Sequence, residues 1–589
     1  MVGSRAAKIG KIALIWTRAM NVTNIELDGL TSITDLFEDL DSISSLTDFV
    51  KFVAKAHRNG VEIFFRCTAD TNPHDSQTTI PWIHEGKLSL PKDYYLDPDH
   101  KEIRNAYVAY ISEVLSLAEL RNGDSVAQEI IQLETEIANY TLSKLEKQQF
   151  KKNFHLKTLD QLPSSWLWQE YFETLGEGYL EYSRISALCV INPTFLEFVS
   201  GLLGEKLNRL ELIQKYAKWK ILLTFSPFLT KAFSAAHFRF FGEKLRGQPE
   251  PEERWVWLLG YLNQHAGHLL GKLYCDACFP SSSKEHVMEI ARTVIEEQKK
   301  LISEVEWMED NTKAHAHEKL NNLLLKVGCP DNYEDYSTFT PSKKDSFVAI
   351  IRQLSVFNMK TNLLLANKPT DREKWLVAPQ EADGFYHIFR NELILPAGIL
   401  QGFFYDPDRD LCANYGAIGA VIGHECIHGY DESGKEVNSR GNMVNWWSYA
   451  DTIRYKRRVQ LIVEQYSSIE VTENHFINGQ LTVGENIADI GGLKCAYHAM
   501  QTALKKHPEA NRILDNFTPE QRFFVSWCQL AREKSREAFL IHGLNVSQHS
   551  PLRIRATQPL KNLEEFYQAF NVKEGDEMFL EEDLRVNIY

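Results

Sequence analysis

The sequence predicts a mainly α-helical protein with small β elements. Two long stretches, 125–152 and 286–326, place apolar residues at helical spacing among Glu and Lys side chains. Strand-like runs are short, and the clearest is Val-Glu-Ile-Phe-Phe at 61–65. The chain has 589 residues, 44% of them apolar, so it is long enough for two to four domains or for two large lobes.

The character of the chain changes at about Pro379. Most of the first 330 residues read as helical, whereas the remainder carries clusters of glycine between apolar runs. Glycine permits close backbone approach, which active sites often use. We therefore predict a mostly helical N-terminal region over 1–335 and a second domain, which carries the chemistry, over 379–589.

Composition excludes some classes of protein. The net charge is −14, and no long block of Lys and Arg is present, so we expect no nucleic-acid partner. No segment reaches the roughly 18 consecutive apolar residues of a membrane span. The N-terminal apolar run, 12–16, is too short for a signal peptide. We expect a soluble protein.

The nine cysteines lie far apart, at a density too low for a disulfide scaffold. Cys275 and Cys278 form a C-x-x-C pair, which can be half of a zinc site or a redox pair. No second pair or nearby histidine completes a structural zinc site, so we assign the pair no function.

The strongest chemical motif is His-Glu-Cys-Ile-His at 424–428. His424 and His428 are four residues apart, so on a helix they share one face and can bind one tetrahedral zinc ion. Glu425 lies beside the first histidine and can take a proton from a metal-bound water. The motif also arises by chance, and two such histidines can instead be half-buried and hydrogen-bonded.

A second motif, Gly-Glu-Asn-Ile-Ala-Asp-Ile-Gly-Gly at 484–492, supplies the third ligand. Glu485 and Asp489 also share a helix face. In isolation the pair can be a solvated acidic surface, but facing the first helix Glu485 completes a His-His-Glu set for one Zn²⁺ per chain. Asp489 and Asp431 can then hydrogen-bond the outer nitrogens of the two ligand histidines.

These motifs resemble those of the neprilysin family of zinc endopeptidases, which includes the endothelin-converting enzymes and bacterial oligopeptidases. Four matches occur in family order: 391–401 (NELILPAGILQ), 424–431 (HECIHGYD), 484–492 (GENIADIGG), and 549–551 (HSP) with Arg555. Weaker matches extend over almost the whole chain: 88–95, 270–279 and 307–328.

The resemblance implies two lobes that enclose a cavity. The catalytic lobe would be thermolysin-like around the zinc helices, and 1–335 would form the cap lobe and part of the scaffold. It implies an endopeptidase or oligopeptidase that hydrolyses small peptides by metal-activated water. An enclosed cavity would admit peptides and exclude folded proteins.

The resemblance also assigns roles to residues. We expect Glu425, His549 and Asp489 to be catalytic, with His549 donating to the oxyanion; otherwise His549 is a capping or buried structural histidine. Arg555 would hold a substrate carbonyl. Asp383 and Gly384 would line the substrate backbone where the family has Asn-Ala, and an ionised Asp accepts a hydrogen bond but cannot donate one.

The sequence also departs from the family. It begins inside the family's extracellular domain, without a tail, anchor or first conserved segment, as a truncated sequence also would. Framework cysteines are replaced by apolar residues such as Ala19 and Val572, and Cys528 lacks its usual partner. We expect a reduced, soluble form, with the cytoplasm favoured.

Two other functions compete with peptide hydrolysis. Asp383-Gly384 and the missing N-terminal segment are compatible with a zinc-containing peptide-binding protein of weak or no turnover. A non-catalytic structural member would have no need of Glu425. The sequence assigns no oligomeric state.

Overall fold

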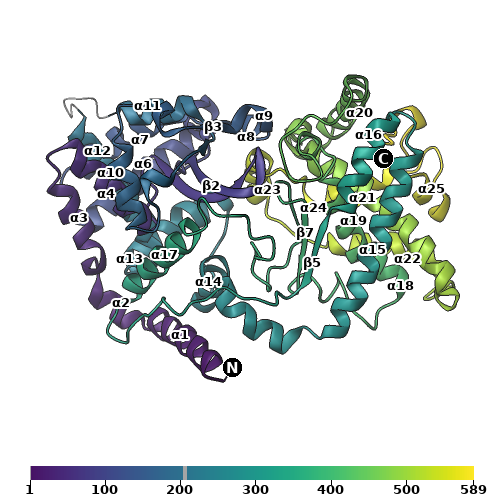
Figure 1. Cartoon of the computed structure of the whole chain (residues 1–589), viewed down its shortest axis with the longest axis horizontal. Coiled ribbons are helices and arrows are strands. Elements are labelled where there is room, and N and C mark those ends of the chain that lie inside the picture. Colours follow the sequence, from purple (N-terminus) through teal and green to yellow (C-terminus); the bar gives the residue numbers. More distant parts are fainter. Residues whose placement is uncertain (1, 203–208) are drawn as a thin grey trace. The chain divides into compact units, whose positions relative to one another are not determined.

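The computed structural model describes residues 2–202 and 209–589, which group into two compact units (Figure 1). The first unit comprises Met1–Asn72, Gln77–Leu269 and Glu334–Asp371, and the second comprises Pro73–Ser76, Leu270–Tyr333 and Arg372–Tyr589. These bounds differ from the predicted ranges 1–335 and 379–589. Residues 270–333 group with the C-terminal part because their helices pack on the helices of that unit.

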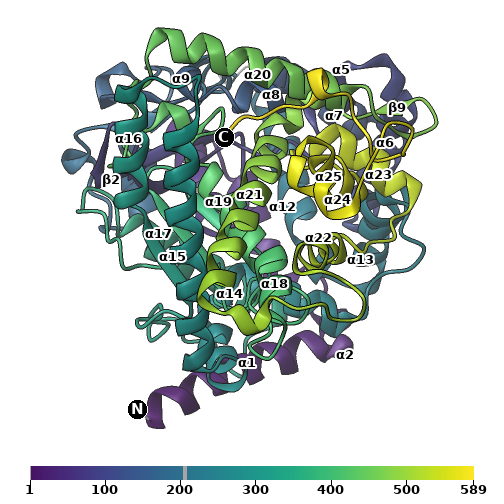
Figure 2. The ribbon, with the colours of Figure 1, turned by 90° about the vertical axis from the view of Figure 1, so that its right-hand side faces the viewer.

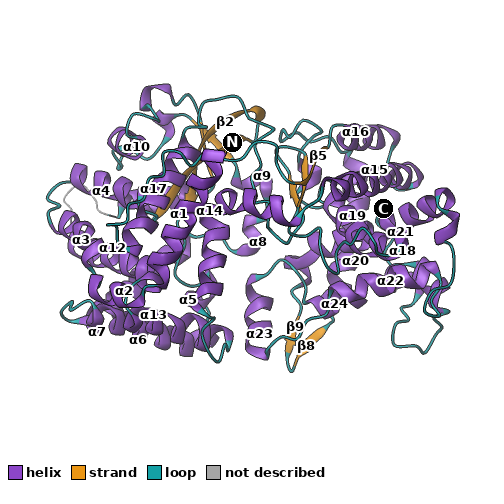
Figure 3. Ribbon diagram, turned by 90° about the horizontal axis from the view of Figure 1, so that it is seen from below, coloured by secondary structure: helices purple, strands orange, loops and turns teal. Residues whose placement is uncertain are grey.

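Helices dominate both units, as predicted, and the strands are few and mostly of five residues or fewer (Figure 3). The predicted strand at 61–65 is wrong except for its last residue, because β1 spans Phe65–Asn72. Phe64 has a φ of 60°, so the backbone turns there before the strand begins. The apolar side chains of this run are nevertheless buried, which explains the misleading pattern.

The predicted long helical stretches are each interrupted. The pattern at 125–152 forms α7 (Gly123–Tyr140) followed by the short helices α8 (Lys144–Lys147) and α9 (Phe150–Asn153). The pattern at 286–326 forms α15 (Ser281–Glu304), α16 (Asp310–Asn321) and the start of strand β5 (Leu324–Gly328).

The first unit packs helices around a small sheet. Its sheet has the order β1-β2-β4-β3, where β2 (Asp75–Glu85) is parallel to β4 (Leu188–Val190) and β3 (His155–Lys157) is antiparallel to β4. The longer helices are α1 (Val2–Met20), α4 (Leu46–Arg58), α6 (Lys101–Leu117), α12 (Leu210–Phe225) and α17 (Phe347–Leu363). The long helix α14 (Arg254–Cys278) belongs to this unit up to Leu269 and has non-helical dihedral angles at Ala266.

The second unit contains a three-stranded sheet and the helices that carry the metal motifs. Strand β7 (Glu392–Pro396) is fully buried between parallel β5 and antiparallel β6 (Phe385–His387). The other elements are α18 (Leu411–Asn414), α19 (Ala420–Ile427), α20 (Tyr449–Ser467), β8 (Glu470–Thr472), β9 (His475–Phe476), α21 (Gly479–Lys506), α22 (Pro519–Leu530), α23 (Glu537–Val546), α24 (Leu552–Thr557) and α25 (Glu564–Phe570).

Helices α19 and α21 pack directly against each other at the centre of this unit (Figure 2). A Cβ atom on Gly423 would lie 2.3 Å from the carbonyl oxygen of Gly492, and one on Gly492 would lie 2.2 Å from the amide nitrogen of His424. The helices are therefore in backbone contact, which only glycine allows. A π-helical turn at Tyr415–Gly419 precedes α19, and such turns are frequent at functional sites.

Cys275 and Cys329 form a disulfide, so the expectation of a fully reduced chain is wrong for this pair. The low density of cysteines did not predict this disulfide, because its two partners lie 54 residues apart in the sequence. Cys278 is free and exposed, and the C-x-x-C pair is therefore not a redox disulfide in this structure. Among the described residues, no helix combines the length and apolar character needed to cross a membrane.

Candidate active site

The three predicted metal ligands converge on one point between α19 and α21. The Nε2 atoms of His424 and His428 are 3.0 Å apart. Glu485 Oε2 lies 3.2 Å from the first of them and 3.7 Å from the second. Zinc bonds of about 2.0–2.1 Å in tetrahedral geometry place neighbouring ligand atoms about 3.3 Å apart. The observed spacing therefore suits a zinc ion.

Each histidine is oriented from behind by a carboxylate. His424 Nδ1 lies 2.8 Å from Asp489 Oδ1, and His428 Nδ1 lies 2.8 Å from Asp431 Oδ2. The Asp431 carboxylate is itself held, because its Oδ1 accepts hydrogen bonds from the amides of Ser433 and Gly434. These bonds place a proton on Nδ1 and leave Nε2 free to bind a metal.

The fit to a cation is supported by Glu485. Its Oε2 atom is buried and has no hydrogen-bond partner, although imidazole nitrogens surround it. Burial alone would raise the pKa of Glu485, but the facing imidazoles of His424 and His428 hold it well below its usual range. A buried, ionised oxygen without a partner is costly, and a divalent cation would satisfy it.

Glu425 faces the same point from α19. Its side chain is buried, and ligand atoms of His424, Glu425 and His428 all lie within 4.8 Å of one another. Burial raises the pKa of Glu425, which makes its carboxylate a stronger proton acceptor. A Cβ atom on Gly384 would lie 3.1 Å from Glu425 Oε1 and 3.0 Å from Val421 Cγ1, a contact that the sequence did not reveal.

Two residues from the last part of the chain complete the cluster. His549 Nε2 lies 3.1 Å from Glu485 Oε2, and half of the His549 side chain is exposed. Arg555 donates from Nε and Nη2 to the two oxygens of Asp489, at 2.8 Å each. Burial alone would raise the pKa of Asp489, but the Arg555 guanidinium lowers it to about 2.

A cavity of about 490 Å³ opens onto this cluster. Asp383 and Gly384, which directly precede β6, line it together with the metal-motif residues, His549 and Arg555. The rest of the wall is largely apolar and comes from five segments, so no single motif marks it in the sequence. These apolar residues are Phe385, Ile399, Phe404, Val421, Trp527, Leu530, Ala531, Leu552 and Ala556.

Two family models match the chain, both described as peptidase family M13, at residues 3–330 and 383–586. Human endothelin-converting enzyme-like 1 is 30% identical over 534 residues, which are 87% of this chain and 67% of that protein. Drosophila melanogaster neprilysin-3 is 29% identical over 533 residues, which are 86% of this chain and 66% of that protein.

Solved structures agree with these matches. Mycobacterium tuberculosis zinc metalloprotease Zmp1, crystallised with an inhibitor, has a TM-score of 0.93 and 30% identity, over 98% of this chain and 88% of that one. PepO from Lactobacillus rhamnosus, at 21% identity and a TM-score of 0.85 over 98% and 90% of the two chains, shares the fold. The predicted resemblance is thus confirmed: the chain belongs to peptidase family M13, the neprilysin and endothelin-converting enzyme family, and is a zinc-dependent metalloendopeptidase.

Proposed function

We propose that this peptidase hydrolyses small peptides in the 490 Å³ cavity, with one zinc ion per chain held by His424, His428 and Glu485. The observation that carries this proposal is the convergence of the three ligand atoms around the unpartnered, buried Glu485 Oε2. Among the described residues, the group of metal-ligating side chains whose ligand atoms all lie within 4.8 Å of one another is His424, Glu425 and His428, which belongs to this same site.

When bound, zinc polarises the scissile carbonyl and lowers the pKa of the attacking water. Glu425 takes a proton from that water as its oxygen forms the new bond to the carbonyl carbon. The same carboxyl group then delivers the proton to the peptide nitrogen as the carbon–nitrogen bond breaks, which leaves a carboxylic acid and an amine; the acid then gives its remaining water-derived proton to the solvent and becomes a carboxylate. The buried position and raised pKa of Glu425 suit both transfers.

His549 and Arg555 act on the substrate oxygens. His549 is half-exposed and its ring faces Glu485 at the cavity, so its position suits donation to the oxyanion better than a capping role. Arg555 uses Nε and Nη2 to bind Asp489, and its remaining amino group, Nη1, takes no part in those bonds. That group can donate to a substrate carbonyl while Asp489 holds the guanidinium in place.

The walls of the cavity define the class of peptide. Phe404, Trp527 and Leu530 favour an apolar side chain next to the scissile bond, because its burial removes apolar surface from water. Asp383 can accept hydrogen bonds from substrate amides, and Gly384 leaves the space beside Glu425 open to the substrate backbone.

A peptide-library cleavage profile, recorded with and without a chelator, tests this function. We expect cleavage beside large apolar residues, loss of cleavage with the chelator and recovery on addition of one zinc equivalent. Zinc binding without cleavage would instead support the peptide-binding alternative, which the family relatives do not favour. Cleavage that resists the chelator would contradict the proposed metal site.

The cytoplasmic location stays a prediction. The Cys275–Cys329 disulfide weighs against it, because disulfides persist mainly in oxidising compartments. Electrophoresis of the protein from its native source, with free thiols blocked before lysis, would decide whether this bond forms there.

A further inference from the structure

A buried lysine lies behind the zinc helix. Lys319, on α16, has only 2% of its surface exposed. Its Nζ donates hydrogen bonds to the backbone carbonyls of Gly429 and Gly434, each at 2.8 Å, and of Val437 at 2.7 Å. An ammonium has three N–H groups and no acceptor, so these three carbonyls satisfy it completely.

Among the described residues no carboxylate forms a direct ion pair with this group, and Asp431 acts on it only at longer range. The ammonium instead lies about 6 Å from the rings of Tyr386, Tyr430 and Trp446, at 6.0, 5.9 and 5.8 Å from their centroids. Burial lowers the pKa of Lys319 to about 7, although the nearby Asp431 carboxylate raises it, so holding a charge there is costly. An apolar side chain would fill the same space without that cost, which indicates that the amino group has a role beyond packing.

The three carbonyls belong to the segment 429–437, which follows the zinc helix directly and which we name the Asp431 turn. Within it, the Asp431 carboxylate accepts from the amides of Ser433 and Gly434 and bonds His428 Nδ1, all at 2.8 Å. Lys319 holds the turn on both sides of Asp431, through Gly429 before it and Gly434 after it.

Further bonds anchor Lys319 and its helix to the same turn. The Tyr430 hydroxyl donates to the carbonyl of Ala316, one helical turn before Lys319, at 2.9 Å. Asn391 donates from Nδ2 to the carbonyl of Lys319 at 2.9 Å and to that of Ser439 at 3.1 Å. The ammonium is therefore presented from a backbone that is itself held in place.

We propose that Lys319 is a positioning residue for the zinc site: its ammonium fixes the Asp431 turn, and Asp431 in turn fixes the orientation of the ligand His428. The inference rests on the proposed function, because it requires His428 to bind the metal. It predicts that loss of the ammonium weakens zinc binding in protein that is still folded.

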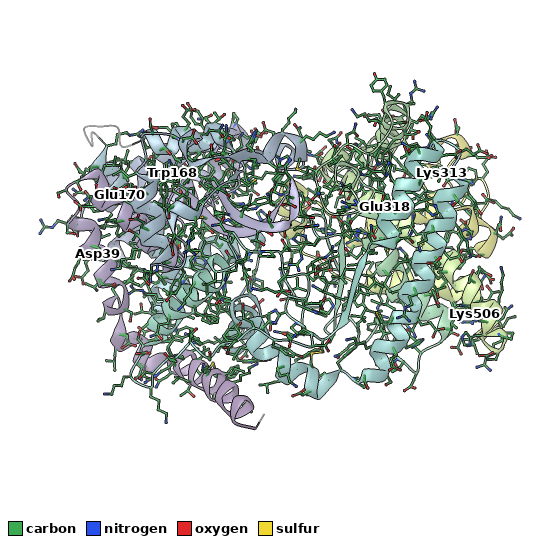
Figure 4. The ribbon with its side chains drawn as sticks, viewed as in Figure 1. Asp39, Trp168, Glu170, Lys313, Glu318 and Lys506 are labelled. Carbon is green, nitrogen blue, oxygen red and sulfur yellow. A yellow bond between two sulfur atoms is a disulfide. The ribbon has the colours of Figure 1, made fainter. Side chains whose placement is uncertain are left out.

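The first experiment compares Lys319→Met with Lys313→Met. Lys313 lies on the same helix (Figure 4), and its Nζ also bonds one backbone carbonyl, that of Ser303 at 2.8 Å, away from the turn. Zinc affinity is measured by chelator competition on protein shown to be folded by circular dichroism. We expect an affinity loss of about tenfold for Lys319→Met, by analogy with other groups that orient metal ligands, and none for Lys313→Met.

A double-mutant cycle tests the route through Asp431. If Lys319 acts by placing Asp431, then Lys319→Met should cost little further zinc affinity in an Asp431→Asn background. Losses that multiply would overturn the proposed route. If Lys319→Met does not fold, Lys319→Gln, which keeps two N–H donors without the charge, replaces it in both experiments, with an intermediate loss expected.

The outcomes separate the two proposals. A parent protein that neither binds zinc nor cleaves peptides refutes the proposed function. A parent that does both, beside a folded Lys319 variant with unchanged zinc affinity, overturns only the inference about Lys319.

Discussion

Arg555 and Asp489 form two parallel hydrogen bonds, each of 2.8 Å, and the same carboxylate bonds the outer nitrogen of His424. One carboxylate thus joins a guanidinium in the cavity wall to a proposed metal ligand. The arrangement gives Arg555 a second role beside its predicted contact with the substrate, because it restrains the group that orients His424.

Arg555→Lys should therefore impair both zinc binding and substrate binding. A lysine ammonium cannot reproduce the two-pronged bond to Asp489. We expect zinc affinity to fall by about tenfold and KM for peptides to rise. Chelator competition and steady-state kinetics measure the two effects. Arg553→Lys is the control, since Arg553 is exposed on the same short helix; an equal effect there would contradict the assignment.

Glu425 and Glu485 should respond differently to the same substitution. Glu425→Gln removes the proton acceptor and should lower kcat by about 10²–10⁴-fold while zinc remains bound. Glu485→Gln removes a ligand and should lower the zinc content itself. Metal analysis and peptide turnover of both dialysed variants check whether Glu425 acts on the proton and Glu485 on the metal. Loss of zinc from Glu425→Gln would show that the two roles are wrongly assigned.

Asp383→Asn should strengthen substrate binding. The amide adds a hydrogen-bond donor that the ionised carboxylate lacks, and Asp383 lies in the cavity wall. One added neutral hydrogen bond contributes about 0.5–1.5 kcal/mol, so KM should fall by about 2–10-fold. Initial rates over a range of peptide concentrations give the answer. An increase in KM would indicate that the carboxylate accepts an essential bond from the substrate.

Substitutions of Gly384 should have graded effects. A Cβ atom there would lie 3.0 Å from Val421 and 3.1 Å from Glu425, so alanine requires a shift of a few tenths of an ångström. Valine would add two further methyl groups to this space. We expect Gly384→Ala to have a small effect on kcat and Gly384→Val to lower kcat at least tenfold, with zinc content unchanged. Equal activity of the two variants would contradict this account.

Acid should destabilise the first unit through His57. Burial lowers the pKa of His57 from 6.5 to about 4, and its ring nitrogens bond the Tyr171 hydroxyl and the Ile63 backbone. The unfolded chain binds a proton first as the pH falls, so this stabilisation is complete above pH 6.5 and is lost toward pH 4. The shift corresponds to about 3 kcal/mol.

Denaturant unfolding of the full chain between pH 4 and pH 7 tests this prediction. The free energy of unfolding should depend less on pH in His57→Gln than in the parent, even if the variant is less stable at pH 7. Parallel pH dependence of the two proteins would show that His57 is not the group responsible.

The sequence predicted the metal cluster because its members repeat at helical spacing. His424 and His428, like Glu485 and Asp489, are four residues apart, so local geometry alone places each pair on one face. Asp431 follows from the same logic. The contact between the two helices did not follow from spacing; it was inferred from the need of a zinc site for a third ligand, and then from the resemblance to a known family.

Other features depend on contacts between distant segments. Lys319 lies more than 100 residues from the carbonyls that it binds. Every residue has a backbone carbonyl, so the sequence does not mark which carbonyls accept these bonds. Phe404 and Trp527 line the cavity from separate segments, and the segment between Cys275 and Cys329 contains α15, α16 and β5. The predicted helical stretch 125–152 failed for another reason. Its helical pattern of apolar residues is continuous, but the helix ends at Tyr140, because such a pattern does not exclude a break.

The contact between Gly423 and Gly492 extends the set of residues on which metal binding depends. The two helices that carry the proposed zinc ligands are in backbone contact at these two glycines. Because neither glycine has a side chain, the helices approach closely, and this approach sets the distance between His424 and Glu485. A single methyl group at either glycine would widen it. An engineer who transplants this site into another helix pair must therefore carry the two glycines along with the ligands.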